Sequence, residues 1–350
     1  MKTKLLIILF LLLLVASLSS CNNKLNKYSK NYFAFGTEID VTIYAKTSKE
    51  ADSYFSETSK IIKEFNKLTD RYTDYENTSG IYYINHNAGS VIEINQSLFD
   101  LIKYSIEQES ILLNDDKPYF TIGIGMISDI YHDLFNNHNG ESFNLSDLNL
   151  EYDDNITTDT SLIVLDSINS TIMIPSNMSL DLGGIAKGYT VEILKDYYNK
   201  NNIKYVIDAG NSSISTNYGN PNRRNNEFRI GLRKPTIDNN TDVFGVLNLE
   251  LNKSISTSAF YQKYIIVDNN IWPSIIDPYT YRPVETDILS ISIITSNSAL
   301  GDILSTTLYM AGYDKAVNFI ESNSDIEGII YKDDNTIFVS TGLTTLFEQK

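Results

Sequence analysis

The second half of the chain is dominated by short β-type segments, and this feature constrains the fold most. Segments rich in β-branched and aromatic residues occur at 205–208, 212–216, 228–232, 243–251, 264–267 and 289–294. Long helical patterns are fewer, and we expect them at 48–68, 96–114, 298–311 and 313–322, with one more ending near 199. Strands that come in runs are typical of α+β domains and not of doubly wound sheets. The sequence therefore predicts a layered α+β domain with mixed or antiparallel sheets and packed helices.

The first half is predicted to add short strands and loops. Strands are expected at 37–45, 91–94, 162–166 and 171–174, and a last hairpin near the other end of the chain at 328–340. Residues 69–87 and 133–160 are rich in Asn, Asp and other turn-forming residues, so both stretches are expected to be loops. Residues 120–131 are expected to begin as a glycine-broken extended piece and to continue as a helix.

The N-terminus has the pattern of an export signal. Two lysines precede an apolar run at 5–15, which is too short to span a bilayer comfortably, and small residues follow it. The sequence Leu18-Ser19-Ser20-Cys21 resembles the lipobox of bacterial lipoproteins. Cys21 is the only cysteine, so it cannot form an intramolecular disulfide, and lipidation explains its position better than redox or metal chemistry does. An uncleaved hydrophobic anchor is the alternative.

These features divide the chain into three parts. Residues 1–20 are predicted to be a lipoprotein signal peptide, 21–31 a lipidated N-terminus and polar tether, and 32–350 one folded domain. The predicted location is the cell membrane, with the protein lipid-anchored on its extracytoplasmic face. The formal net charge of −16 argues against nucleic acid or anionic lipid as a partner, and an anionic ligand would need a local cation.

Residues 180–190 are the first candidate for a binding site. A strand-like Leu-Asp-Leu meets Gly183 and Gly184, and a helical pattern follows. The glycines allow close approach of the backbone to a ligand, and the N-terminus of a helix favours phosphate oxygens. Lys187 adds a positive charge, whereas Asp181 would repel a bare phosphate unless a metal ion or a donor-rich group is also bound. The alternative is an ordinary turn between a strand and a helix.

Asp302 and Thr306 form the second candidate. They stand four residues apart at the start of a predicted helix, so their side-chain oxygens lie one turn apart on one face. Two such oxygens suit a hard cation such as Mg²⁺, which prefers oxygen ligands and keeps several waters. The alternative is that Asp302 caps the helix and Thr306 bonds to its own backbone.

Other catalytic patterns are absent from the sequence. With three histidines, one cysteine and no His-Glu-x-x-His, a zinc hydrolase is disfavoured. The glycine segment lacks the ending of a P-loop, and no Gly-x-Ser-x-Gly elbow is present.

The order and spacing of these pieces resemble the ApbE family of FAD:protein FMN transferases, which are often exported lipoproteins. Residues 181–189, Asp-Leu-Gly-Gly-Ile-Ala-Lys-Gly-Tyr, match the family motif almost letter for letter. Further similar segments occur in the family's order at 35–37, 79–85, 120–131, 228–235, 256–258, 275–278 and 302–306. The resemblance covers nearly all of the chain beyond the leader and implies the layered fold predicted above.

The resemblance also implies a role for each site residue. The carbonyl of Gly184, with Asp302 and Thr306, would hold Mg²⁺ against the pyrophosphate of FAD, and Asp302 and Lys187 would carry the chemistry. The FAD site would be lined by Phe35, Phe120, Thr121, Ile122, Asp181, Lys187, Thr257, Ser258 and Ile276, with Tyr72 or Tyr75 near the flavin. In the family reaction, a Ser or Thr hydroxyl of an exported partner protein attacks the FMN-side phosphorus of FAD, and AMP leaves.

The chain departs from the family pattern at several positions. Ser274 stands where the family usually has a histidine that could shuttle a proton, and Thr121, Gly123 and Met126 replace the usual Asp, Thr and Pro. Two alternatives to FMN transfer therefore stay open. One is an FAD pyrophosphatase that releases FMN and AMP, and the other is a non-catalytic flavin-binding lipoprotein.

Overall fold

The computed structural model describes residues 25–114, 117–219, 228–237 and 242–350. The predicted signal peptide and Cys21 lie outside these residues. Within them, none of the helices combines the length and the apolar character needed to cross a bilayer.

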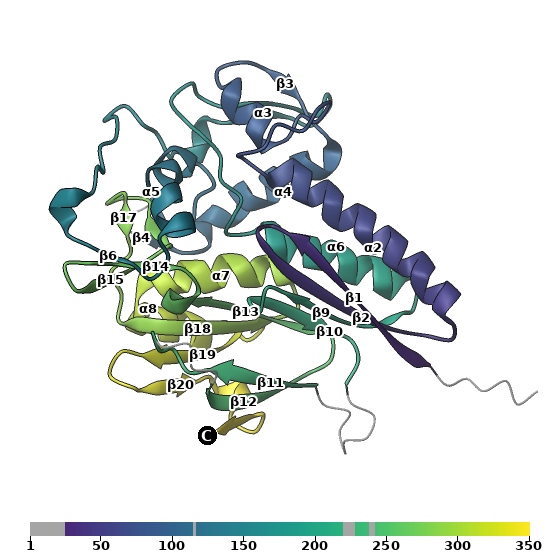
Figure 1. Ribbon diagram of the computed structural model, residues 1–350. Helices are drawn as coiled ribbons and strands as arrows, with labels where there is room; N and C mark the ends of the chain where they lie inside the picture. The colour runs from purple at the N-terminus through teal and green to yellow at the C-terminus, as the bar shows by residue number, and fades with distance from the viewer. Residues whose placement is uncertain (1–24, 115–116, 220–227, 238–241) are drawn as a thin grey trace, which may run out of the picture.

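An eight-stranded antiparallel sheet forms the centre of the molecule (Figure 1). Every neighbouring pair of its strands is antiparallel. The strands lie in the order β1 (Asn26–Ala34), β2 (Thr37–Ala45), β9 (Lys204–Ala209), β10 (Ser213–Thr216), β13 (Lys253–Ala259), β18 (Ile288–Thr295), β19 (Glu327–Lys332) and β20 (Ile337–Val339).

Three long helices pack on one face of this sheet, where Figure 1 shows them side by side. They are α2 (Ser48–Thr69), α6 (Ala186–Lys200) and α7 (Ser298–Ala311). Apolar residues of α2 and α6 share a core with β2 and β9, while α7 and α8 (Tyr313–Ser322) share one with β18 and β19. The opposite face is covered by a small sheet of β11 (Phe228–Arg233), β12 (Val243–Leu249) and β21 (Phe347–Gln349). The layered α+β prediction is confirmed.

A second group of elements lies beyond the helices. It contains α3 (Ile81–His86), α4 (Gln96–Gln108), α5 (Gly125–Asn137) and the small sheet of β3 (Ile92–Glu93), β8 (Thr171–Met173) and β7 (Val164–Asp166). β14 (Tyr264–Val267) and β15 (Asn270–Pro273) form a hairpin that packs against α5 and pairs with β6 (Ser142–Phe143). Two further hairpins are β4 (Leu113–Asn114) with β5 (Lys117–Pro118), and β16 (Ile276–Asp277) with β17 (Arg282–Pro283).

Most predicted elements are present, with five corrections. The predicted tether is wrong from residue 26 onward, because 26–34 form β1, which pairs along its whole length with β2 and packs Tyr28 and Tyr32 against the core. The predicted loop 69–87 contains α3, and the predicted helix 96–114 ends as α4 at 108, before a 3₁₀ turn. α5 continues to residue 137, into the predicted loop 133–160. The sequence pattern also missed β13, whose residues are mostly Ser and Thr.

Candidate active site

A cleft of about 410 Å³ lies between α5, α6, α7 and β13, and it gathers most of the residues predicted from the sequence. Those that line it are Tyr72, Phe120, Thr121, Asp181, Gly184, Lys187, Thr257, Ser258, Ile276, Asp302 and Thr306. Three predicted residues do not line it. Ile122 is fully buried in the core, Phe35 borders a neighbouring cavity, and the Tyr75 hydroxyl is bonded to Asp70.

Asp302 is held at the floor of the cleft by donors from three separate elements. Its Oδ1 accepts hydrogen bonds from the Ser213 hydroxyl of β10 at 2.6 Å and the Ser256 hydroxyl of β13 at 2.8 Å. Its Oδ2 accepts the backbone N–H of Gly188 of α6 at 2.7 Å. The side chain of Asp302 is therefore fixed in one orientation, with the residue only 7% exposed.

The pKa of Asp302 is raised, because burial disfavours the carboxylate more than its surroundings favour it. The positive charge of Lys187 and the bonds from the two serines and Gly188 act in the opposite direction and lower the pKa. A cation placed near this carboxyl group would act in the same direction as Lys187 and favour the carboxylate form.

The capping alternative for Asp302 is wrong. α7 begins at Ser298, and its N-cap is Asn297, whose side chain accepts the N–H of Leu300 at 2.9 Å. Asp302 stands one turn further into the helix, where the backbone N–H groups already have partners within the helix. The predicted helix at 298–311 is present with the same bounds, so Asp302 lies inside it and does not open it.

The oxygens around Asp302 fit a hard cation that keeps several of its own waters. A carboxylate offers about four lone-pair directions, and the three bonds above leave one, on Oδ2. The hydroxyl of Thr306 lines the same cleft, 3.4 Å from the Ser258 hydroxyl. Among the described residues, no three His, Cys, Asp or Glu side chains cluster to hold a metal ion. Such a set suits Mg²⁺ better than zinc, because Mg²⁺ is bound through few protein oxygens.

The glycine turn between residues 181 and 186 forms the adjacent wall. The N–H of Gly183 donates to Asp181 Oδ1 at 2.8 Å, and α6 begins at Ala186 without a side-chain cap at its N-terminus. A Cβ atom on Gly184 would lie 3.1 Å from the Phe120 ring, so a side chain here would have to push that ring aside. The turn thus presents backbone groups, Lys187 and one carboxylate to the same space.

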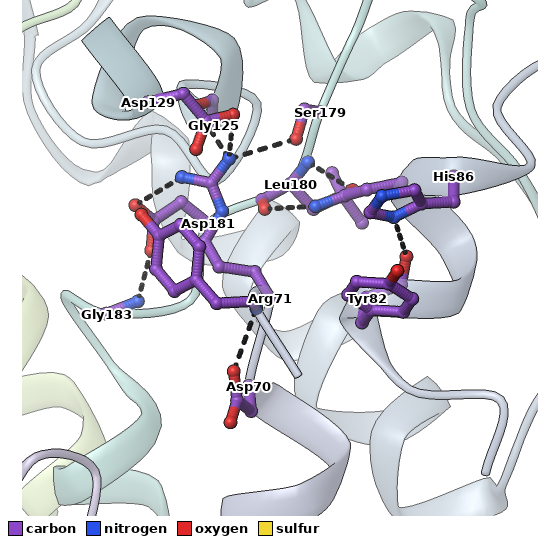
Figure 2. Close-up of polar contacts among 12 residues, drawn as sticks. Asp70, Arg71, Tyr82, His86, Gly125, Asp129, Ser179, Leu180, Asp181 and Gly183 are labelled. Atoms are coloured by element: carbon purple, nitrogen blue, oxygen red, sulfur yellow. Dashed lines mark hydrogen bonds and ion pairs between the residues drawn. The ribbon is translucent and has the colours of Figure 1, made fainter. Parts of the chain in front are cut away.

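Arg71 fixes the carboxylate of Asp181, and the sequence analysis missed it. Figure 2 shows its guanidinium group pointing between Asp181 and Asp129. Nη1 lies 3.2 Å from Asp181 Oδ2, and Nη2 lies 2.8 Å from Asp129 Oδ2. Nη2 also donates to the carbonyl of Gly125 at 2.7 Å. Arg71 is buried and belongs to the stretch 69–87, which was predicted as a loop. It is the only Lys or Arg in that acidic stretch, and this was the one sequence feature that could have pointed to it.

Tyr72, and not Tyr75, is the tyrosine at the cleft. Its ring packs against the ring of His132 with centroids 3.9 Å apart and the two planes tilted by 39°. The Arg71 guanidinium lies 5.1 Å from the centroid of the Tyr72 ring, over its face. The residue is 48% exposed. A planar ligand ring can therefore still reach Tyr72 from the cleft.

A second cavity of about 630 Å³ adjoins the cleft. Lys187, Ser212, Thr257 and Gln262 line both. An elongated ligand can therefore extend from the Asp302 floor past Lys187 into the neighbouring cavity, which Phe35 borders.

Comparison with solved structures identifies the class of fold. Its fold is similar to the crystal structure of the ApbE protein from Thermotoga maritima, with a TM-score of 0.75 and 21% identity over 92% of this chain and 99% of that one. It is also similar to the flavin transferase ApbE from Vibrio cholerae, with a TM-score of 0.69 and 18% identity over the same shares.

The family is shown by the sequence comparison. The ApbE family model matches residues 35–330, so the chain belongs to the ApbE family. It is 25% identical to the FAD:protein FMN transferase of Klebsiella pneumoniae strain 342, over 90% of this chain and 92% of that protein. It is 28% identical to the FAD:protein FMN transferase of Haemophilus influenzae strain Rd over 157 residues, which are 45% and 44% of the two chains.

The family and the enzyme class predicted from the motifs are confirmed by these matches. The class is FAD:protein FMN transferase, the description carried by the similar proteins of known function. The predicted fold is confirmed as well. The roles of individual residues, the metal ion and the lipid anchor remain predictions.

Proposed function

We propose that this protein uses Mg²⁺ to transfer the FMN moiety of FAD to a Ser or Thr hydroxyl of an exported acceptor protein, with release of AMP. The observation that carries the proposal is that motif segments from distant parts of the chain meet at one place. Segments around residues 121, 184, 257, 276 and 302, which are far apart in the chain, meet at one cleft. The acidity of the chain as a whole is compatible with a dinucleotide ligand, because Lys187 and a bound metal ion supply local positive charge.

Each wall of the cleft would have a separate task. Mg²⁺ would be held by the backbone carbonyl of Gly184 and the side chains of Asp302 and Thr306. When bound, the ion would neutralise charge on the phosphates and orient them. Lys187 and the N-terminus of α6 would bind phosphate oxygens, and Tyr72 would stack on a ring of the ligand. Arg71 would keep Asp181 in place beside them.

The reaction is a displacement at phosphorus. The acceptor oxygen forms a bond to the FMN-side phosphorus, and the bond from that phosphorus to the bridging oxygen breaks, so AMP carries the bridging oxygen away. The hydroxyl proton must go to a group of the protein or to solvent.

The test uses covalent flavin as its readout. Full-length protein, FAD and Mg²⁺ are added to the envelope fraction of cells that lack the gene, and in-gel flavin fluorescence and AMP are measured. A fluorescent band whose mass spectrum places FMN on a Ser or Thr supports the proposal, and chelation by EDTA should abolish the band. AMP and free FMN without a band would mean an FAD pyrophosphatase. FAD binding without AMP would mean a flavin-binding protein.

We further propose that Cys21 carries a lipid anchor on the extracytoplasmic face of the cell membrane. The apolar run at 5–15 and the Leu18 to Cys21 match support this proposal. Cys21→Ser should release the protein from membranes or leave an unprocessed precursor. Cleavage after residue 20 with unchanged membrane binding would contradict it.

A further inference from the structure

Lys263 is a second lysine at the cleft that neither the sequence motifs nor the roles above use. It immediately precedes β14, is half-buried, and lines the cleft together with Lys187 and Asp302. Its Nζ donates a hydrogen bond to the side-chain carbonyl of Asn136, on α5. Its own carbonyl accepts the N–H of Ser274 at 2.9 Å across the hairpin. Lys263 thus stands opposite the serine that replaces the family's usual histidine, and both residues line the cleft.

The surroundings of Lys263 disfavour its charged form. Within the described part of the chain, no carboxylate lies at ion-pair distance from its Nζ, and its one hydrogen-bond acceptor is a neutral amide. Burial lowers the pKa of Lys263, and the positive charge of Lys187 lowers it further. A lysine in these surroundings gives up its proton more readily than a surface lysine does.

The other titratable groups at the cleft are less suited to accept a proton from a substrate. They are Tyr72, Tyr119, Tyr131, His132, Asp181, Lys187 and Asp302. Asp302 already accepts three hydrogen bonds, and Asp181 is paired with Arg71 and the N–H of Gly183. His132 is the main competitor, and its ring packs against that of Tyr72.

We propose that Lys263 is the general base of the transfer reaction, an inference that rests on the proposed function. Its neutral Nζ amine takes the proton of the acceptor hydroxyl while the hydroxyl oxygen bonds to the FMN-side phosphorus and the bond to AMP breaks. The products are the FMN phosphoester, AMP and a Lys263 ammonium group, which returns its proton to solvent before the next turnover. No electron transfer is involved, and atoms and charge balance.

Two substitutions separate a base from a simple positive charge. Lys263→Gln removes both functions, whereas Lys263→Arg keeps the charge but cannot release a proton. If Lys263 is the base, both variants transfer FMN at least 100-fold more slowly to the envelope acceptor, while their Kd for FAD stays within about threefold of wild type. If Lys263→Arg transfers at close to the wild-type rate, or if FAD binding accounts for the whole loss, the role as a base is overturned.

The pH profile provides a signature that a structural role would not produce. Because the neutral amine is the active form, the wild-type rate at saturating FAD should rise with pH and level off above the pKa of Lys263. Lys263→His should retain partial activity with this rise shifted to lower pH, since imidazole has a lower pKa. His132→Gln should keep the wild-type profile. If the rise disappears in His132→Gln and persists in Lys263→Gln, then His132 is the base and the inference is wrong.

A matched control variant and the wild-type result distinguish failure of the proposed function from failure of the proposed role of Lys263. Lys103→Gln, on the exposed side of α4 next to Glu107, removes a lysine far from this chemistry and should behave as wild type. Absence of any FMN adduct with the wild-type protein would overturn the proposed function and the role of Lys263 with it. A normal adduct with unchanged Lys263 variants would overturn only the role of Lys263.

Discussion

Asp302 and Glu109 are two buried carboxyl groups with similar exposure and different surroundings. Asp302 is 7% exposed and Glu109 is 6% exposed. Glu109 accepts the N–H of Ile122 at 2.9 Å and a hydrogen bond from the Thr160 hydroxyl, much as Asp302 accepts bonds from fixed donors. Burial raises the pKa of both groups, and it raises the pKa of Glu109 to about 7.

The difference lies in the neighbouring charge. The charge of Lys187 lowers the pKa of Asp302, whereas the charge of Asp159 raises the pKa of Glu109 further. Glu109 borders a different cleft, of about 580 Å³, and accepts the backbone N–H of Ile122. Burial by itself does not make a carboxyl group a metal ligand. The positive charge of Lys187 and the position beside Thr306 in the cleft distinguish Asp302.

The largest expected effect is on catalysis. Asp302→Asn should lower Mg²⁺-dependent FMN transfer by about 1,000-fold, or about 4 kcal/mol, because the charge that binds the ion is lost. Glu109→Gln should stay within a few-fold of wild type. Both are measured as initial rates of AMP release and acceptor fluorescence. A fully active Asp302→Asn enzyme at limiting Mg²⁺ would remove the metal site.

The fold of Asp302→Asn needs its own control. The asparagine amide must point its NH₂ group toward either the Gly188 N–H or the two serine hydroxyls. The serine hydroxyls can rotate to accept from this NH₂ group, and the amide oxygen can then accept the N–H of Gly188, so that N–H keeps a partner. Because hydrogen bonds to a neutral amide are weaker than those to a carboxylate, we expect the free energy of unfolding to fall by about 1 kcal/mol. Circular dichroism and urea unfolding would distinguish this loss from loss of the fold.

The second prediction concerns pH and stability. Glu109 has a pKa of about 7 in the folded state against 4.5 as its ordinary value. Between these two values the folded protein holds one proton more than the unfolded chain, so its stability falls as pH rises, by about 3 kcal/mol in total. Glu109→Gln, which is neutral at every pH, should remove this fall. Urea unfolding at pH 5 and pH 8 tests it, and an unchanged pH slope in the variant would refute it.

The third prediction uses the ion as a probe of the folded state. Binding of Mg²⁺ at 100 times its Kd should stabilise the protein by about 2.7 kcal/mol. The wild type and Glu109→Gln should show this gain in thermal melts, and Asp302→Asn should not. An equal gain in all three proteins would place Mg²⁺ elsewhere.

The smallest effects come from removing one donor to each carboxyl group. Ser256→Ala and Thr160→Val each delete one hydroxyl and should cost about 1 kcal/mol of stability. Ser256→Ala should also weaken Mg²⁺-dependent transfer, because Asp302 loses part of its fixed orientation. Thr160→Val should leave transfer close to wild type. Equal effects on transfer would mean that the two carboxyl groups do not differ in function.

The sequence predicted the local features of the site well and the polar contacts poorly. The turn at residues 183–184 followed by a helix, and the pair Asp302 and Thr306, were visible because their geometry depends on neighbours within one turn. β13 was missed because its serines and threonines lack the apolar alternation of a half-buried strand. Those same polar residues supply Ser256 to Asp302 and Thr257 and Ser258 to the cleft.

By itself, the sequence determined the α+β layering, the family and most of the predicted residues that meet at the cleft, since periodicity and ordered motifs are properties of short segments. Only the tertiary structure decided how those residues are held. Asp302 receives its donors from residues 46, 89 and 114 positions away, and Arg71 reaches Asp181 across 110 positions. Such bonds depend on strand register and helix packing, and no local pattern encodes them. The same reason explains why Lys263 became visible only when β14 and β15 were seen paired beside α5.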